Sequence, residues 1–346
     1  MKFRHSLILI ALFATLFVSC FDESEDDGQN DKLGNWVTKA WYSGIERSYG
    51  TCFELNGFGY YGMGRDKDND YVNDMWRYDP SQDSWTQVAS FPGTLRAFNF
   101  SVANGSKGYV GTGYDKKYDL QDFWEFDPNQ NESDTAKLAG KWTQLADFPG
   151  GKRRNATAFA IGSAIYAGTG YNKLDKNYFN DFYKYENGEW TIAKQFKGDK
   201  REGANTCVMD GKAYLISGHR SRYLNDFWIF DPEINDWIQL EDLDDVEEGG
   251  LAGINRAFGN AFSVEGKIYL FGGSNGATLS TIFEWNPQTL EWMQKTSLET
   301  GFTRMGAGSF VINNMAYVVG GEAGGKNPLA DFYLFQPSAE KEEDDN

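Results

Sequence analysis

The sequence is poor in the residues that build metal centres, disulfide frameworks and membrane-spanning helices. It has 2 histidines and 3 cysteines among 346 residues, and His219 is the single histidine beyond the first few positions. A histidine-based metal centre therefore lacks ligands. After residue 20 no apolar run is long enough to cross a bilayer as a helix. The formal net charge of -17 argues against a nucleic-acid partner, because phosphate binding requires a basic face.

The amino-terminal segment combines a positive start, a short apolar stretch and a cysteine. Lys2 and Arg4 precede "LILIALFATLFV", and Ser19 and Cys20 follow. This pattern resembles a bacterial lipoprotein signal peptide, which implies a signal at residues 1–19 and a lipid on Cys20 that anchors the chain to a membrane. An ordinary secretory signal or an uncleaved anchor is the alternative.

Acidic segments flank the central region at both ends. Residues 20–33 begin "CFDESEDDGQND" and form a predicted solvated tether, and residues 338–346 form an acidic tail. The tether is similar to the acidic run of some Gram-negative lipoproteins that reach the cell surface. The resemblance implies an outer-membrane lipoprotein of the cell envelope, either periplasmic or surface-exposed.

The region between these ends contains one unit repeated six times. In each unit an arginine precedes a tyrosine by thirteen positions, and the tyrosine opens an apolar run that ends in glycine, followed by a loop and a segment such as "NDFWIFDP". Alternating aromatic and β-branched residues between turn signals predict strands. The arginine–tyrosine pairs are Arg47 and Tyr60, Arg96 and Tyr109, Arg153 and Tyr166, Arg201 and Tyr214, Arg256 and Tyr269, and Arg304 and Tyr317.

These units resemble kelch repeats, although the glycine pair of that motif is complete only at Gly272-Gly273 and Gly320-Gly321. The resemblance implies an all-β fold, a six-bladed β-propeller with four-stranded blades, at residues 34–337. A fourth-strand tryptophan follows five units and is missing after the sixth, while Trp36 stands before the first. We therefore expect the amino-terminal strand to complete the last blade and close the ring, and we expect the propeller to be monomeric.

Two columns of residues in the first strand of each unit differ in size. Seven positions before the tyrosine the side chains are mostly large and apolar, and we expect them to pack between blades. Eight positions before the tyrosine the side chains are small, and we expect them to line the channel. Cys207 belongs to the first column and Cys52 to the second, in blades across the ring from each other. This separation predicts free thiols.

Two sets of residues are predicted to meet at one mouth of the channel. The first is the six repeated arginines, which either stabilise the blades through the repeated Asp74, Asp122, Asp181, Asp226 and Asp331 or converge on an anionic or polyhydroxyl ligand. The second set follows each glycine run and varies from unit to unit, so it is free for function. Its members are Arg65, Tyr114, Tyr171, His219, Ser274 and Glu322.

Metal chemistry finds little support at this rim. His219 stands beside Arg220 and Arg222, and nearby cations oppose its protonation and its use as a ligand. We interpret it as a polar loop residue or a ligand contact. Asp66, Asp68 and Asp70 alternate like the start of a calcium loop, but Arg77 occupies the position of the final carboxylate, so they form only a weak calcium candidate.

Three classes of function remain open, and one of them is a structural subunit of a larger envelope assembly whose partner chain occupies the rim; the other two are as follows. The first is a noncatalytic envelope module that binds a glycan or a protein partner at its rim, with no cofactor. The second follows from a resemblance to N-acetylneuraminate epimerases, which implies a sugar-acid epimerase or mutarotase with Glu322 as base and the nearby Arg304 and Arg47 holding the sugar acid. The copper chemistry of galactose oxidase, another kelch relative, is excluded because one histidine cannot replace two.

Overall fold

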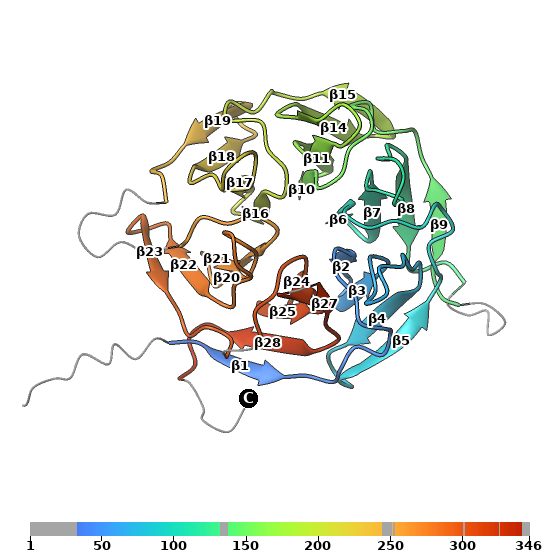
Figure 1. Ribbon diagram of the computed structural model, residues 1–346, viewed down its shortest axis with the longest axis horizontal. Coiled ribbons are helices and arrows are strands. Elements are labelled where there is room, and N and C mark those ends of the chain that lie inside the picture. The colour runs from blue at the N-terminus through green and yellow to red at the C-terminus, as the bar shows by residue number, and fades with distance from the viewer. Residues whose placement is uncertain are drawn as a thin grey trace, which may run out of the picture. The chain divides into compact units, whose positions relative to one another are not determined.

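The computed structural model describes residues 33–131, 138–243, 251, 253–299, 302–324 and 326–340. These residues fold into six four-stranded antiparallel sheets around a central axis (Figure 1). No helix in the described ranges is long and apolar enough to cross a membrane. The predicted six-bladed propeller is confirmed. The signal peptide, Cys20, nearly all of the tether and residues 341–346 of the tail lie outside the described residues.

Each sheet is one blade, and its strands run outward from the centre in chain order in the first five. The blades are β2 (Thr51–Leu55), β3 (Phe58–Gly62), β4 (Met75–Asp79) and β5 (Ser84–Val88); β6 (Phe100–Asn104), β7 (Lys107–Gly111), β8 (Phe123–Asp127) and β9 (Lys141–Gln144); β10 (Thr157–Ile161), β11 (Ala164–Gly168), β14 (Phe182–Glu186) and β15 (Glu189–Ile192); β16 (Asn205–Met209), β17 (Lys212–Ile216), β18 (Phe227–Asp231) and β19 (Asp236–Gln239); β20 (Asn260–Val264), β21 (Lys267–Phe271), β22 (Ile282–Asn286) and β23 (Glu291–Gln294); and β24 (Gly308–Ile312), β25 (Met315–Val319), β28 (Phe332–Gln336) and β1 (Asn35–Thr38).

The sixth blade takes its outer strand from the other end of the chain. Strand β1 pairs antiparallel with β28, with Trp36 opposite Phe335. The blue β1 and the red β28 accordingly lie side by side in Figure 1. Radial repetition of short blades leaves only short outer strands as sheet edges, which limits pairing with other chains.

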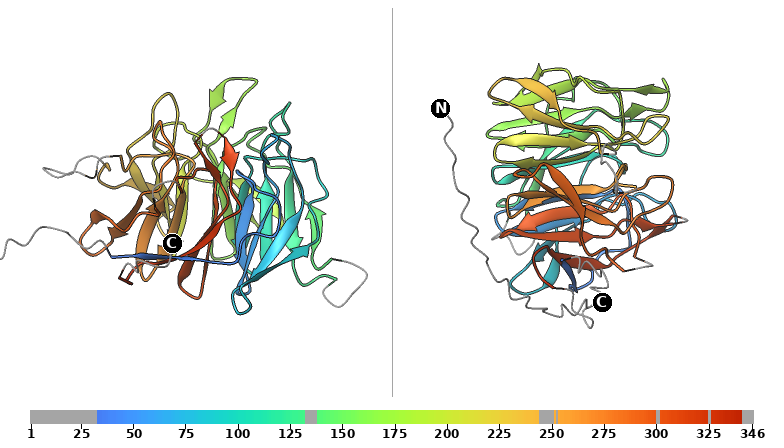
Figure 2. Two further views of the ribbon diagram at one scale, coloured as in Figure 1. Left: turned by 60° about the horizontal axis from the view of Figure 1, so that its bottom comes forward. Right: turned by 90° about the vertical axis from the view of Figure 1, so that its left-hand side faces the viewer.

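Two short hairpins extend the loops of the third and sixth blades. They are β12 (Tyr171–Asn172) with β13 (Asn177–Tyr178), and β26 (Glu322–Ala323) with β27 (Asn327–Pro328). In the left view of Figure 2 the yellow-green β12–β13 hairpin rises above the rest of the ring. Both hairpins begin at a residue of the variable set, Tyr171 and Glu322, so they border the same mouth.

Neighbouring blades interlock through rings that lie over glycines. A Cβ atom added at Gly59 would lie 2.2 Å from the ring of Phe310, and one added at Gly108 would lie 2.4 Å from the ring of Phe53. Only glycine permits this approach. Phe53 and Phe310 belong to the large apolar column, and both are buried in clusters shared between blades. The predicted packing role of that column is confirmed.

Five of the repeated tryptophans tie their blade to the outer part of the preceding one. Their indole Nε1 groups donate to backbone carbonyls that follow the preceding outer strand. The donor–acceptor pairs are Trp36 to Thr296, Trp85 to Ala40, Trp142 to Ala89, Trp190 to Ala146 and Trp237 to Lys194, at 2.9–3.3 Å. A buried indole N–H requires such a partner, and this requirement explains why a tryptophan recurs at that position.

A closed circle of backbone hydrogen bonds surrounds the channel near the arginines. It is formed by the residue two positions after each arginine, and each N–H donates to the carbonyl of the equivalent residue in an adjacent blade. In donor order the circle runs Tyr49, Gly306, Phe258, Gly203, Asn155 and Phe98, and returns to Tyr49, with distances of 2.7–3.1 Å. All six residues have a positive φ, between 49° and 64°. We call these six residues the inner ring.

Candidate functional site

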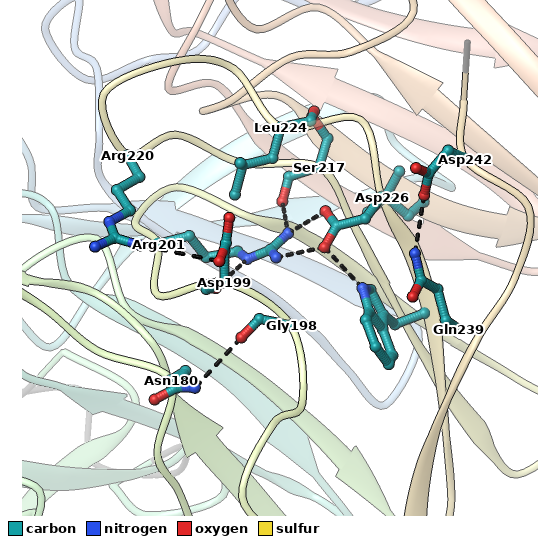
Figure 3. Close-up of polar contacts among 12 residues, drawn as sticks. Asn180, Gly198, Asp199, Arg201, Ser217, Arg220, Leu224, Asp226, Gln239 and Asp242 are labelled. Carbon is teal, nitrogen blue, oxygen red and sulfur yellow. Dashed lines mark hydrogen bonds and ion pairs between the residues drawn. The ribbon is translucent and has the colours of Figure 1, made fainter. Parts of the chain in front are cut away.

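The six repeated arginines are structural groups. Arg201 donates from Nη1 and Nη2 to the two carboxylate oxygens of Asp226, each at 2.5 Å, and from Nη1 to the carbonyl of Ser217 at 2.8 Å (Figure 3). Its Nε donates to the carbonyl of Asp199 at 2.9 Å. This planar fork holds together the start of one strand, the end of the next and the entry to a third.

The same arrangement recurs around the ring, and it corrects one prediction. All six arginines are 0% exposed, so their donors face the protein and not a ligand. The architectural alternative holds for the five units that carry the repeated aspartate. The carboxylate pairs are Arg47 with Asp74, Arg96 with Asp122, Arg153 with Asp181, Arg201 with Asp226 and Arg304 with Asp331.

The fifth unit lacks the repeated aspartate. Thr281 occupies that position, and Arg256 donates to its hydroxyl at 3.1 Å and to its carbonyl at 3.0 Å. Burial without a carboxylate at this position lowers the pKa of Arg256. In the first and second units burial raises the pKa of Asp74 and Asp122, but the hydrogen bonds and charge of Arg47 and Arg96 outweigh it, and both pKa values lie below their ordinary range.

The variable set lies one step away from this buried layer. Each of its members forms an isolated β-bridge with the residue that directly follows a repeated arginine. The bridges join Ser48 to Arg65, Ala97 to Tyr114, Arg154 to Tyr171, Glu202 to His219, Ala257 to Ser274, and Met305 to Glu322. The predicted gathering of this set at one mouth is therefore present, and the bridges add a second variable column, the residues directly after the arginines.

Glu322 forms a buried cluster with partners that the sequence did not indicate. Its Oε2 accepts hydrogen bonds from Nη2 of Arg65 and, at 3.1 Å, from the hydroxyl of Ser48. Glu322 is 2% exposed. The expected pairing of Glu322 with Arg304 or Arg47 is wrong, because those guanidinium groups are occupied by Asp331 and Asp74.

A second charged cluster centres on Arg154. Its Nε donates to Oδ1 of Asp119 at 2.6 Å, and its guanidinium carbon lies 3.4 Å from the centre of the Tyr114 ring. Oδ2 of Asp119 accepts the backbone N–H of Lys173 at 2.7 Å, and Lys173 Nζ donates to the Tyr114 hydroxyl at 3.0 Å. Within the described part of the chain, Nη2 of Arg154 is buried and has no hydrogen-bond partner.

Glu202 lies beside this second cluster, in the next blade. Its Oε2 accepts a hydrogen bond from Nδ2 of Asn155 at 2.8 Å, and its Oε1 is 3.9 Å from Nδ1 of His219. Burial raises the pKa of Glu202, and burial lowers the pKa of His219. At neutral pH the imidazole is therefore an uncharged polar group, as expected for a loop residue or a ligand contact.

Aromatic side chains from the inner ring lie next to charged groups of the mouth. The ring centres of Tyr49 and Phe98 are 4.4 Å apart, and those of Tyr49 and Phe258 are 6.2 Å apart. The guanidinium of Arg65 lies 5.5 Å from the Tyr49 ring centre. A Cβ atom at Gly306 would lie 2.7 Å from the Tyr49 ring, so the neighbouring glycine leaves space for it. Tyr49, Phe98 and Phe258 form an aromatic layer, which is half-buried.

Below the aromatic layer the channel is narrow and polar. A cavity of about 280 Å³ is lined by side chains of the small column, including Cys52, Ser101 and Thr206. The predicted channel-facing role of that column is confirmed. Cys52 and Cys207 are free thiols, as expected, and burial raises the pKa of both, which makes them poor nucleophiles.

The calcium candidate is not supported by the contacts of its carboxylates. Oδ1 of Asp66 accepts the backbone N–H groups of Asp68 and Asp70, which closes a local turn. Asp68 pairs with Lys67, and Asp70 pairs with Lys116. Among the described residues no group of three histidine, cysteine or acidic side chains is arranged to hold a metal ion. The loop is a solvated acidic hairpin.

Comparison with known proteins agrees with the architecture. The kelch motif matches residues 60–92, 200–243 and 255–299. This chain is a kelch-repeat β-propeller. The solved structure titled "Structure of YjhT" resembles the propeller with a TM-score of 0.69 and 18% identity, over 85% of this chain and 96% of that one. At that identity the likeness concerns the fold.

Curated relatives of this kelch propeller carry different functional names. Alpha-scruin of Limulus polyphemus is 25% identical over 72% of this chain and 27% of its own length. N-acetylneuraminate epimerase of Escherichia coli strain K12 is 26% identical over 55% of this chain and 47% of its own length. The chain thus spans about a quarter to a half of the length of these relatives. The name of the second relative describes a sugar-acid epimerase.

Several residues at the mouth were missed from the sequence. They are Ser48, Arg154, Glu202 and the aromatic layer, which stand one or two positions after a repeated arginine. Counting forward from each arginine would have found them, since these positions vary between repeats while the arginine does not. Asp119 could not have been found by counting from an arginine, because it lies in a loop outside the repeated pattern.

Proposed function

We propose that the mouth of this kelch propeller binds a glycan. The observation that carries the proposal is the arrangement in which the rings of Tyr49, Phe98 and Phe258 adjoin one another and the Arg65 guanidinium lies over two of them. Glu322 and Glu202 lie close enough to influence the pKa of Tyr49. Aromatic faces pack against the apolar faces of sugar rings, while charged and amide groups exchange hydrogen bonds with hydroxyls. A rigid scaffold with unrepeated residues at its rim is the usual construction of a binding site.

The location of this module is part of the same proposal. A lipid on Cys20 and the acidic tether of residues 20–33 would hold the propeller at the cell envelope, where extracellular glycans or envelope proteins are accessible. A protein loop could occupy the same mouth, and that alternative is an outcome of the glycan experiment.

The proposal is tested by calorimetry of the purified protein with panels of neutral and acidic oligosaccharides. The expected result is binding that weakens in Tyr49→Ala, which removes the largest ring of the aromatic layer. Tyr118→Ala is the matched control, because Tyr118 is 49% exposed on a loop of the second blade. Absence of binding across both panels would reject a glycan and favour a protein partner.

A second candidate, a sugar-acid epimerase or mutarotase, is favoured by two carboxylates at the mouth, the buried Glu322 and the half-buried Glu202. Glu322 is ion-paired with Arg65, whereas burial raises the pKa of Glu202. Two carboxyl groups in different environments suit a base and an acid in ring opening of a hemiacetal. Relatives named N-acetylneuraminate epimerase support the substrate class.

Exchange spectroscopy with N-acetylneuraminate separates catalysis from binding. A catalyst would accelerate anomeric exchange, and Glu202→Gln and Glu322→Gln would each reduce the acceleration by about 100-fold. If the protein binds the sugar but anomeric exchange proceeds at the uncatalysed rate, the epimerase function is rejected and only the binding function remains.

A further inference from the structure

We propose that Arg154 and Lys173 anchor an oxyanionic group of an acidic glycan at the rim of the third blade. The inference rests on the proposed glycan-binding function and names the class of ligand. It concerns residues one step outside the buried arginine layer, at a position where the residue type varies from unit to unit.

The unpaired donor on Arg154 is the starting observation. The side chain of Arg154 is 13% exposed, and its Nη2 is buried without a hydrogen-bond partner in the described residues. Leaving a buried charged donor unpaired is unfavourable, and native structures seldom tolerate it. Arg153, the preceding residue, shows the contrast, because it donates to both carboxylate oxygens of Asp181 and to backbone carbonyls.

The protein holds this guanidinium in place without satisfying it. Asp119 accepts Nε, and its second oxygen is taken by the backbone N–H of Lys173. The Tyr114 ring supports the flat face of the guanidinium at 3.4 Å. The guanidinium therefore has a fixed orientation, in which Asp119 bonds to Nε and not to the buried Nη2. A preorganised fork of this kind suits a carboxylate or sulfate, which accepts two parallel hydrogen bonds.

The surroundings supply a second cation and an adjoining acceptor. Lys173 Nζ is hydrogen-bonded to the Tyr114 hydroxyl and lies 5.0 Å from the centre of that ring. Glu202 lies close enough for Arg154 to lower its pKa against the larger effect of burial, yet the two residues form no ion pair. A sugar whose anionic group bonds to Arg154 would have hydroxyls within reach of Glu202 and Asn155.

Long-range electrostatics do not produce this preference. The chain carries a formal net charge of -17, which repels anions at a distance. Preference for an acidic sugar must come from short-range contacts at Arg154 and Lys173. The preference for an acidic sugar should therefore weaken when Arg154 or Lys173 is replaced. It should persist when an arginine that contacts an aromatic ring elsewhere in the protein is replaced.

The test compares methyl glucuronide, methyl glucoside and glucose 6-sulfate as ligands in NMR titrations of the whole protein. For the wild type we expect the glucuronide to bind about tenfold more tightly than the glucoside. Comparing the affinities for glucose 6-sulfate and methyl glucuronide shows whether the site prefers a sulfate or a carboxylate. Arg154→Met combined with Asp119→Asn, which avoids an unpaired buried carboxylate, should lower the affinity for the glucuronide more than that for the glucoside and so remove most of the preference.

Two further variants keep the result interpretable. Lys173→Met removes the second cation while its backbone N–H still bonds to Asp119, so it should reduce the preference by about threefold even if the double variant fails to fold. Arg77→Met is the matched control, because Arg77 stacks on Phe58 at 4.7 Å in strand β4; it should retain the full preference.

The outcomes separate the two proposals. Equal binding of charged and neutral sugars by the wild type would overturn the anchor and leave glycan binding standing. A preference that persists in the double variant and in Lys173→Met would overturn the assignment to these residues. No binding of any of the three sugars, together with failure of the oligosaccharide panels, would overturn the glycan function and the anchor with it.

Discussion

Arg153 and Arg154 are adjacent arginines with opposite relations to the protein. Arg153 is 0% exposed and shares its donors among Asp181 and backbone carbonyls, and its guanidinium lies 3.8 Å from the Phe179 ring centre. Arg154 points the other way, pairs through Nε with Asp119 and retains an unpaired donor. Successive side chains of an extended segment face opposite sides, so residue type alone does not assign a role.

The same contrast holds between two layers of the propeller. The arginine layer is identical in all six units because each guanidinium joins three segments of its blade. The layer one residue later contains serine, alanine, arginine, glutamate and methionine, and only some of these form polar clusters. The residues that are identical in all units therefore have a structural role. The residues that differ between units lie at the mouth where the binding function is proposed.

The largest expected effect separates the two neighbouring arginines by stability. Arg153→Met should lower the free energy of unfolding by about 3–5 kcal/mol, because it leaves the carboxylate of Asp181 partly buried and uncompensated. Arg154→Met should cost about 1–3 kcal/mol, since Asp119 loses one bond and retains another. Urea denaturation measures both, and equal losses would contradict the division into layers.

Acid should weaken the arginine layer before the mouth. The folded-state pKa values of Asp74 and Asp122 lie below the ordinary value, so these groups stabilise the fold above about pH 4, and that contribution is lost as the pH falls through the lowered values. Unfolding midpoints measured from pH 6 down to pH 2 should decrease. Asp122→Asn should be less stable at pH 6 and show a shallower decrease, whereas an unchanged slope would contradict the assignment.

The fifth blade permits a test by gain of an interaction. Thr281→Asp places a carboxylate beside Arg256, as in the other five units, and should raise the free energy of unfolding by about 1–2 kcal/mol. Thr281→Asn has the same size without the charge and should give little or no gain. A loss of stability in the aspartate variant, measured by calorimetry, would indicate that desolvation outweighs the new pair.

The smallest effect is expected at Glu202. Because burial raises its folded-state pKa, the native state binds the extra proton, and stability falls as the pH rises from about 4.5 through the raised pKa. Glu202→Gln should remove this part of the pH dependence and change stability at pH 7 by less than about 1 kcal/mol. Denaturation curves at pH 4.5 and pH 7 provide the comparison.

Much of the fold could be predicted because the repeat is a local pattern. The thirteen-residue spacing from arginine to tyrosine identifies six units, and the columns containing Phe53 and Cys52 identify the packing and channel faces of the inner strands. Trp36 marked the strand that pairs with β28. Alternation along a strand and repetition between blades are both visible in a linear sequence.

The sequence by itself determined the number of blades, their strand order and which faces are apolar, since these depend on spacing within one repeat. Only the tertiary structure decided which charged groups meet. Glu322 met Arg65 across a large sequence separation, Arg154 met Asp119, and Glu202 met Asn155. Such contacts depend on the curvature of the ring and on burial, because charged side chains taken out of water must find partners wherever the fold brings them.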